Sequence, residues 1–405
     1  MSSPPPAISA ALSLGGAVAA STGPRGFPLI LAAAPGAAAA ALVAAAGGAG
    51  AWAAANQPEL EALLSRYGAV LFRGLVRSDD AADAAAGASP AALAFSAFVR
   101  GFSGARWADL PYADSLSYAV RTEVCDRVCT TNEGRLGGMV WHHEQAQAPR
   151  FPRAVFFFCE VPAEPGCGGG TGISPSAAVH DALAREHPAF LAACAAKGLV
   201  YRARLPPRDG AGAGSGVGRS WRSFWRCAKK AEAEARMREL GYSWQWEAAA
   251  GGGGGGGGEE EEEEEEEDVL RMVTPVLPAV VAAPPSATLV FFNQAIAQVL
   301  SNAKWFLEVS DSAKTLTPEE EAAKVGEFLT LGDGSPVDLA ALRFAAQVAD
   351  ENAYDIEWQR NDVALLDNYL VMHARRAWAG DGPRKVLASL VNEPERLPTP
   401  GGGAK

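Results

Sequence analysis

The stretch MVWHHE, residues 139–144, places two histidines and a glutamate directly after three apolar residues. Alternate side chains of an extended strand share a face, so the sequence predicts that His142 and Glu144 point the same way and His143 points away. An imidazole and a carboxylate on one face provide two of the three protein ligands of a metal site. The candidate for the third ligand is His373, which ends a strand-like run far along the chain.

Two histidines and one carboxylate on one face of an ion form the facial triad of non-haem Fe(II) oxygenases, which leaves further coordination positions open. The competing short motif of zinc proteases fails, because a helix carrying His143 and Glu144 would need a second histidine where the chain has Gln147. The candidate catalytic and metal-binding residues are therefore His142, Glu144 and His373.

Two further residues favour a co-substrate that carries a carboxylate. Arg384 lies eleven residues after His373, at the start of a strand predicted over 385–391, where a guanidinium can clamp a carboxylate bidentately. Thr171 follows three glycines, residues 168–170, and a hydroxyl presented by such a turn can support the same carboxylate.

This pattern resembles the TauD/TfdA family of Fe(II)/2-oxoglutarate dioxygenases, and most of all the plant clavaminate synthase-like proteins. The matching motifs occur in order between about Phe27 and Asn392, so the resemblance covers most of the chain. The motifs are 68–74 (GAVLFRG), 141–147 (WHHEQAQ), 156–160 (FFFCE), 169–171 (GGT), 218–221 (GRSW), 291–293 (FFN), 358–363 (WQRNDV), 367–368 (DN), 373–376 (HARR) and 383–389 (PRKVLAS).

The resemblance implies an α+β, mainly β fold: a double-stranded β-helix, or jelly-roll, of the clavaminate synthase-like kind with flanking helices. It implies Fe(II) ligands at His142, Glu144 and His373, and cofactor-binding residues at Arg384, for the distal carboxylate of 2-oxoglutarate, and Thr171. The implied reaction uses O₂ to oxidise, as a rule by hydroxylation, an unidentified small molecule and releases succinate and CO₂. A catalytically silent metal-binding or interaction protein of the same fold is the alternative.

Other residues near these motifs are assigned supporting roles. We interpret Arg375 and Arg376, which resemble the arginine pair after the family's distal histidine, as structural residues, together with His143, Asn293 and Asp367. The candidates for the substrate pocket are Arg121, Asn132, Arg219 and Trp221.

The chain departs from the family pattern at two places. Gly170 stands where the family's turn usually has an acidic residue, and Gln145 stands where it has a methionine. The first change affects the local turn and the second alters the polarity of the pocket.

Hydrophobic periodicity predicts the main elements of secondary structure. It predicts helices over 57–67, 89–101, 176–187 and 224–241, and strands over 27–31, 68–75, 153–161, 289–293, 363–367 and 385–391. Because the strands are short and do not alternate regularly with helices, an antiparallel β architecture with helices outside it is expected.

One catalytic domain is expected over residues 27–395, between disordered tails at 1–26 and 396–405. Residues 248–268 form a low-complexity insert that includes eight successive glycines and nine successive glutamates. Glycines cannot pack and the glutamates repel one another, so we expect a disordered surface loop. An acidic tract that binds a basic partner or cations is the alternative.

Composition excludes several classes of partner. The net charge is −12, and removing the nine charges of the glutamate run leaves −3, with no basic face that would indicate a nucleic acid. Residues 26–58 carry no charge, but they are mostly Ala and Gly with Pro28 and Pro35 among them, so no membrane span is expected. The expected partner is a small-molecule substrate.

The six cysteines are scattered, which favours reduced thiols and a reducing compartment. We therefore expect a cytoplasmic protein. The first 25 residues contain no acidic residue and only one basic residue, Arg25, so an organelle transit peptide is the alternative.

Overall fold

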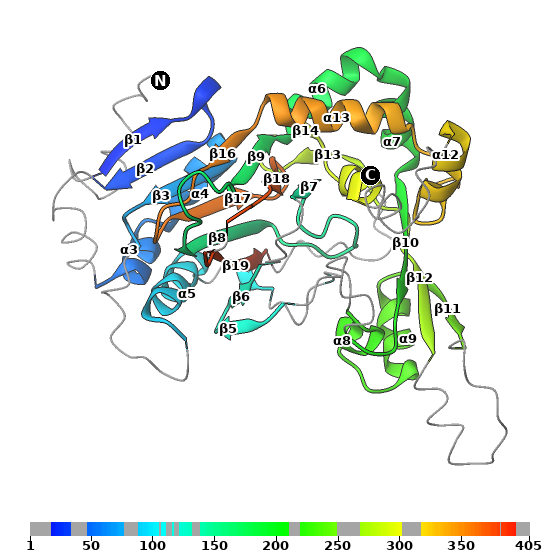
Figure 1. Ribbon diagram of the computed structural model, residues 1–405, viewed down its shortest axis with the longest axis horizontal. Coiled ribbons are helices and arrows are strands. Elements are labelled where there is room, and N and C mark those ends of the chain that lie inside the picture. Colours follow the sequence, from blue (N-terminus) through cyan, green and yellow to red (C-terminus); the bar gives the residue numbers. More distant parts are fainter. Residues whose placement is uncertain are drawn as a thin grey trace.

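Two β-sheets face each other at the centre of the molecule, and helices cover their outer faces (Figure 1). A computed structural model describes residues 18–33, 47–76, 88–104, 107–110, 116, 121–131, 138–209, 219–248, 268–301, 317–380 and 382–393. This arrangement confirms the double-stranded β-helix with flanking helices that the sequence predicts.

The larger sheet has nine strands and is antiparallel except where β2 and β3 pair. In spatial order the strands are β1 (Val18–Thr22), β2 (Leu29–Ala33), β3 (Ala69–Arg73), β17 (Val363–Asp367), β8 (Ala154–Val161), β19 (Lys385–Asn392), β6 (Val128–Thr130) and β5 (Glu123–Cys125), and β4 (Ala108–Asp109) also pairs with β19.

The smaller sheet has four antiparallel strands, and it carries two of the candidate ligands. Its order is β16 (Tyr354–Ile356), β9 (Thr171–Pro175), β18 (Val371–Arg375) and β7 (Met139–His142). Ile173 and Val371 of this sheet pack against Phe157 and Val386 of the larger sheet, so one apolar layer joins the two sheets.

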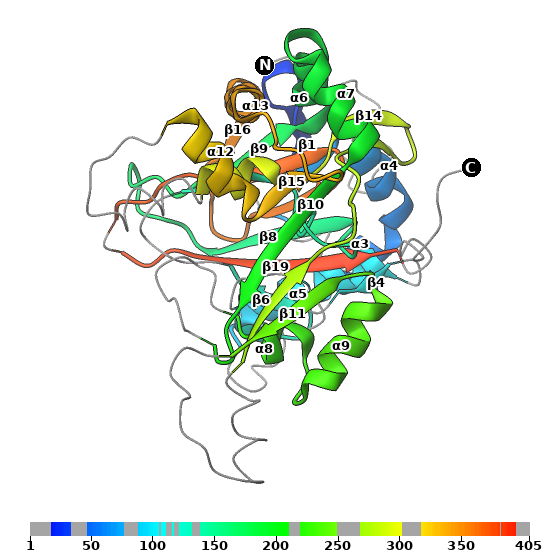
Figure 2. The same cartoon turned by 90° about the vertical axis from the view of Figure 1, so that its right-hand side faces the viewer.

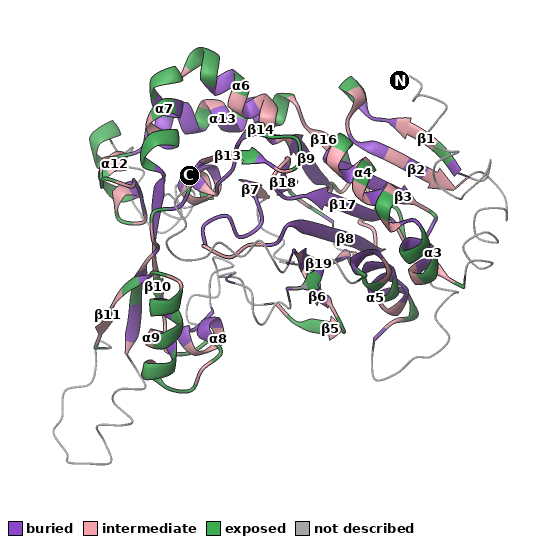
Figure 3. Ribbon diagram, turned by 180° about the vertical axis from the view of Figure 1, so that it is seen from behind, coloured by how far each residue is buried: buried purple, intermediate pink, exposed green. Residues whose placement is uncertain are grey.

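Strand β8 shows why the larger sheet is buried on both sides (Figure 3). Its side chains alternate, so Val155 and Phe157 face the smaller sheet while Phe156 and Phe158 face the helices behind. Phe158 stacks on Phe95 with ring centroids 4.9 Å apart. A nearly continuous apolar run therefore forms a central strand with two packed faces.

Helices cover each sheet. Behind the larger sheet lie α3 (Ala49–Ala55), α4 (Gln57–Tyr67) and α5 (Pro90–Ser103). Outside the smaller sheet lie α6 (Ser176–Glu186), α7 (Pro188–Lys197), α12 (Pro318–Gly326) and α13 (Leu339–Glu351). N-capping side chains fix where several helices begin. At the N-terminus of α5, for example, Ser89 Oγ accepts a hydrogen bond from the Ala92 amide at 3.1 Å.

An arm projects from the two-sheet core (Figure 2). It consists of β10 (Leu199–Leu205), β12 (Val269–Val273) and β11 (Ser243–Glu247), with α8 (Trp221–Trp225) and α9 (Lys230–Glu239) packed on them around their own apolar cluster. Strand β15 (Leu329–Leu331) pairs with the base of β10, and β13 (Val280–Ala283) and β14 (Thr288–Phe291) form a separate hairpin.

Two predictions from the sequence need correction. The tail expected over 1–26 is too long, because β1 and the short 3₁₀ turn η2 (Pro24–Gly26) are ordered and β1 pairs with β2 along all five of its residues. These small residues carry little hydrophobic signal and depend on the sheet for their order. The single helix expected over 224–241 is two helices, since Arg226 adopts left-handed backbone torsions after α8.

Parts of the predicted organisation lie outside the described residues. These parts are the first seventeen residues, the insert between Ala248 and Asp268, and the C-terminal tail. All six cysteines are described and are free thiols. Cys129 and Cys194 are buried in the apolar clusters, and Cys125 and Cys227 are partly buried against them. In the part of the chain that the structure describes, no helix has the length and apolar character to cross a bilayer.

Asp362 makes the stability of this fold depend on pH. It is fully buried just before β17, where it accepts a hydrogen bond from the Gln359 amide at 3.0 Å, and burial raises its pKa to about 6. The folded protein therefore keeps this proton up to a higher pH than the unfolded chain, whose aspartate has a pKa near 3.8. The stabilising contribution is complete below the unfolded pKa and is lost as pH rises through the folded one.

We expect this one group to lower the free energy of unfolding by about 2–3 kcal/mol between pH 4 and pH 7. Asp362→Asn removes the titration, so its stability relative to wild type should increase across that interval in urea unfolding measured at several pH values. Asp181→Asn, at an exposed aspartate, is the control. A difference between Asp362→Asn and wild type that does not change with pH would contradict the prediction.

Candidate metal centre

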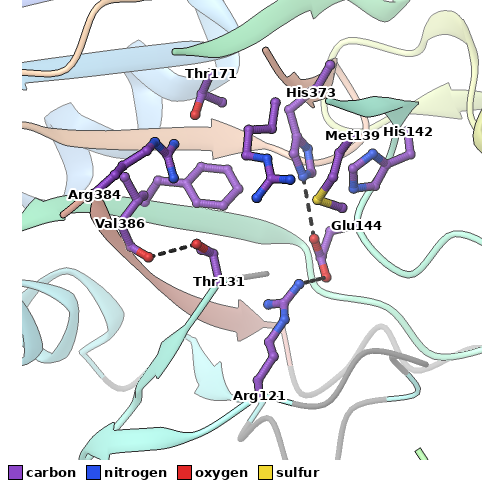
Figure 4. A pocket seen from close by; sticks show the side chains of 12 residues that line it. Arg121, Thr131, Met139, His142, Glu144, Thr171, His373, Arg384 and Val386 are labelled. Carbon is purple, nitrogen blue, oxygen red and sulfur yellow. Dashed lines mark hydrogen bonds and ion pairs between the residues drawn. The ribbon is translucent and has the colours of Figure 1, made fainter. Parts of the chain in front are cut away.

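Three potential ligand side chains meet between the two sheets (Figure 4). Each of His142, Glu144 and His373 offers a donor atom, and the three atoms lie within 4.8 Å of one another. All three side chains are buried, with residue exposures of 4–7%. The structure thus brings together the three residues that the sequence selects as a candidate triad.

Strand pairing explains how the two histidines meet. His142 on β7 and His373 on β18 are directly paired across the antiparallel ladder, and their ring centroids are 4.2 Å apart. Phe157 of the larger sheet lies 5.1 Å from the His373 ring and forms an apolar wall beside it. The two histidines therefore stand on paired strands rather than on loops.

Glu144 does not lie on a strand, contrary to the sequence prediction. Strand β7 ends at His142, and Glu144 lies in the turn that follows. Asn368 fixes this turn: its Oδ1 accepts from the Glu144 amide at 2.8 Å, and its Nδ2 donates to the Glu144 carbonyl at 3.0 Å. The carboxylate still reaches the histidines, because the turn returns it to their side, with Glu144 Oε2 3.5 Å from His373 Nε2.

The protonation states suit a cation. His142 Nδ1 donates to the Val140 carbonyl at 2.7 Å, so its proton is on Nδ1 and Nε2 keeps a lone pair. Burial, aided by His373, lowers the pKa of His142 to about 4, which keeps the ring neutral. Burial alone would raise the pKa of Glu144, but Arg121 and His373 outweigh it and hold this pKa well below its usual range. Neutral imidazoles with one carboxylate are the donor set that a divalent iron site requires.

His143 points away from the cavity, as the sequence predicts. Its Nδ1 lies 3.1 Å from the Asn293 carbonyl oxygen and its Nε2 lies 2.7 Å from Ser176 Oγ. Burial lowers its pKa to about 3. The ring is a neutral connection between the turn after β7, helix α6 and the segment after β14.

Arg384 and Thr171 line the same cavity as the triad (Figure 4). Arg384 is 7% exposed, and its Nε donates to the Gly169 carbonyl at 2.7 Å. Gly169 has φ +75°, and a β-carbon there would lie 2.9 Å from Arg384 Nε. Trp358 Nε1 donates to Thr171 Oγ1 at 3.0 Å, which leaves the threonine proton available for another acceptor.

The cavity includes residues that the sequence assigned differently. Arg375 lines it, although we interpreted it as structural, because it shares the face of β18 that carries His373. Arg376 does have a supporting role: it pairs with Asp350 and Asp355 at 2.6 Å each. The complete lining is Arg121, Thr131, Met139, His142, Glu144, Phe157, Thr171, His373, Ala374, Arg375, Arg384 and Val386.

The four substrate-pocket candidates have different outcomes. Arg121 lines the cavity, whereas Asn132 lies outside the described residues. Arg219 and Trp221 belong to the arm, where Arg219 Nη2 donates to the Ser223 carbonyl at 2.8 Å and Trp221 is buried in the arm's apolar cluster. Those two assignments to the cavity are wrong, because a match to a sequence motif does not show where in the fold the motif lies.

Comparison with known proteins identifies the family of the chain that carries this site. The family model described as "Taurine catabolism dioxygenase TauD, TfdA family" matches residues 46–390. The chain belongs to the TauD/TfdA family. This TauD/TfdA protein is accordingly a dioxygenase, and the resemblance seen in its sequence motifs is confirmed.

Individual proteins of known name or structure are also similar to this chain. A clavaminate synthase-like protein of Arabidopsis thaliana is 32% identical over 333 residues, which cover 82% of this chain and 83% of that protein. A taurine dioxygenase from Burkholderia xenovorans has a TM-score of 0.42 at 14% identity, covering 93% of this chain and 91% of its own. The structure of AAD-2 in complex with Mn(II) and N-oxalylglycine has a TM-score of 0.41 at 15% identity, covering 93% and 97%.

Among the described residues, the geometry predicts one divalent-cation site. We expect wild-type protein to bind Mn(II) with a stoichiometry of one, and Glu144→Ala or His373→Ala to weaken binding by more than about 100-fold, because each removes a ligand. Electron paramagnetic resonance of free Mn(II) measures this directly. His180→Ala, on helix α6, is the matched control and should leave the affinity unchanged. Equal affinity in wild type and His373→Ala would contradict the assignment.

Proposed function

We propose that this protein is an Fe(II)- and 2-oxoglutarate-dependent oxygenase that oxidises a small molecule by hydroxylation, with release of succinate and CO₂. One observation carries the proposal: the His142, Glu144 and His373 donor atoms share a buried cavity with Arg384. The family assignment supports the same reaction class. A small-molecule substrate and a cytoplasmic location are part of the proposal, and the free thiols support a reducing compartment.

The three ligands would hold the cation on one face and leave the opposite positions open. When bound, Fe(II) together with 2-oxoglutarate would supply the electrons that reduce and so activate O₂. An imidazole must be neutral to bind a metal, so two histidine ligands and one carboxylate would leave a ferrous ion with a net positive charge, which favours an anionic co-substrate.

Arg384 would bind the distal carboxylate of 2-oxoglutarate. Its Nε donates to the Gly169 carbonyl, which restrains the plane of the guanidinium, and the side chain lines the cavity beside the triad. Thr171 would donate its hydroxyl proton to the same carboxylate, since Trp358 already donates to Thr171 Oγ1. Both side chains are buried, and a charge pair in a buried site is screened less than one in water.

The walls of the cavity would keep water away from the reacting groups. Phe157 and Val386 of the larger sheet and Met139 of the smaller sheet line it. Apolar walls lower the local dielectric and so strengthen the orienting effect of Arg384 on a bound carboxylate.

The first experiment is an anaerobic titration of the purified protein with Fe(II) and 2-oxoglutarate together, followed by visible spectroscopy. We expect a weak metal-to-ligand charge-transfer band in wild type, loss of the band in His373→Ala, and a need for much more 2-oxoglutarate in Arg384→Ala. Succinate release then supports a substrate screen. No band in folded, iron-loaded wild type would overturn the proposal and favour the catalytically silent alternative.

Gly169 provides a second test that leaves Arg384 in place. Gly169→Ala should displace the guanidinium and weaken 2-oxoglutarate binding by about tenfold or more, because the new β-carbon would overlap Arg384. Calorimetric titration of Mn(II)-loaded protein with 2-oxoglutarate measures the effect. Gly166→Ala is the matched control, since Gly166 has a similar φ of +81° but open space at the β-carbon position. Equal losses in the two variants would mean that backbone strain, not Arg384, is responsible.

A further inference from the structure

The carboxylate of Glu144 is divided between two partners. Its Oε2 lies 3.5 Å from His373 Nε2, on the side of the metal ligands, whereas its Oε1 lies 3.2 Å from Arg121 Nη2. The Arg121 and Glu144 side chains are each 6% exposed, so both charges are buried together. Figure 4 shows the two contacts on different oxygens of the carboxylate.

Arg121 reaches Glu144 from the opposite sheet. It lies two residues before β5, which pairs with β6, and β6 pairs with β19 at the edge of the larger sheet. Glu144 follows β7 of the smaller sheet, so this ion pair connects the two sheets at the metal site.

A glutamate ligand needs such a partner. A carboxylate can bind a cation through one oxygen or through both, and glutamate has one more side-chain torsion than aspartate with which to choose. A second coordinated oxygen would occupy a position that 2-oxoglutarate or O₂ requires at an open site. An arginine on one oxygen makes that oxygen unavailable to the metal, because a buried charge-assisted hydrogen bond is costly to break.

We propose that Arg121 is a positioning residue that keeps Glu144 a one-oxygen ligand and thereby preserves the coordination position that 2-oxoglutarate uses. This inference rests on the proposed metal site and extends it to a residue that does not contact the metal. It also gives a function to the β5–β6 hairpin, which presents Arg121 to the smaller sheet.

The test compares Arg121→Met with wild type, both loaded with Mn(II). We expect Arg121→Met to bind Mn(II) at least as tightly as wild type, because two carboxylate oxygens replace one. It should bind 2-oxoglutarate about tenfold or more weakly in calorimetry, and a crystal structure should show both Glu144 oxygens on the metal. Arg121→Lys, which keeps the charge, should recover most of the 2-oxoglutarate affinity.

Two controls separate positioning from general damage. Arg127→Met removes an arginine from the same β5–β6 hairpin, where it pairs with the exposed Asp126, and should behave as wild type. Circular dichroism and the thermal transition establish folding, and Arg121→Gln replaces the methionine variant if that variant does not fold.

The outcomes distinguish this inference from the proposed function. If Arg121→Met binds 2-oxoglutarate within about twofold of wild type, or keeps Glu144 on one oxygen, the positioning role is wrong while the proposed function stands. If metal and 2-oxoglutarate binding are intact and only substrate-dependent succinate release fails, Arg121 acts on the substrate instead. Failure of wild type to bind Mn(II) would overturn the proposed function, and this inference with it.

Discussion

The antiparallel pairing of β7 with β18 is the constraint on which the candidate site depends. It places His142 opposite His373 although the two residues are far apart in the sequence. Everything else at the site is arranged around this pair: the turn after β7 returns Glu144 to the same side, and the larger sheet supplies Phe157 and Arg384 from across the apolar layer. A shift of one residue in this register would turn one histidine to the other face of the sheet.

The site residues that can be recognised by residue type and spacing alone could be predicted from the sequence. His142, Glu144 and His373 form a donor set whose meaning does not depend on neighbours, and Arg384 and Thr171 follow motifs with fixed spacing. Strong apolar runs such as β8 and β17 could also be predicted, because central strands buried on both faces carry the clearest signal. The weakly apolar β1 could not, since its order comes from pairing with β2 rather than from its own composition.

The residues that act through long-range contacts could not be placed. Arg121 meets Glu144 only because a hairpin at the edge of one sheet faces a turn of the other, and no spacing rule contains that relation. Arg375 could have been found, since it is two residues after His373 on one strand and so shares its face. Arg219 and Trp221 show the opposite error, in which a family-like motif belongs to the arm, away from the cavity.

The glycine- and glutamate-rich insert joins two strands that are already held side by side. Glu247 on β11 pairs with Val269 on β12, so the ends of the insert are fixed by the ladder whatever lies between them. Loop-closure entropy grows only slowly with length, and β11 and β12 are strands of the arm rather than of the two-sheet core (Figure 1). This position is therefore a natural site for genetic insertion: a fluorescent domain or an affinity tag placed there would label the enzyme while leaving both chain ends unmodified.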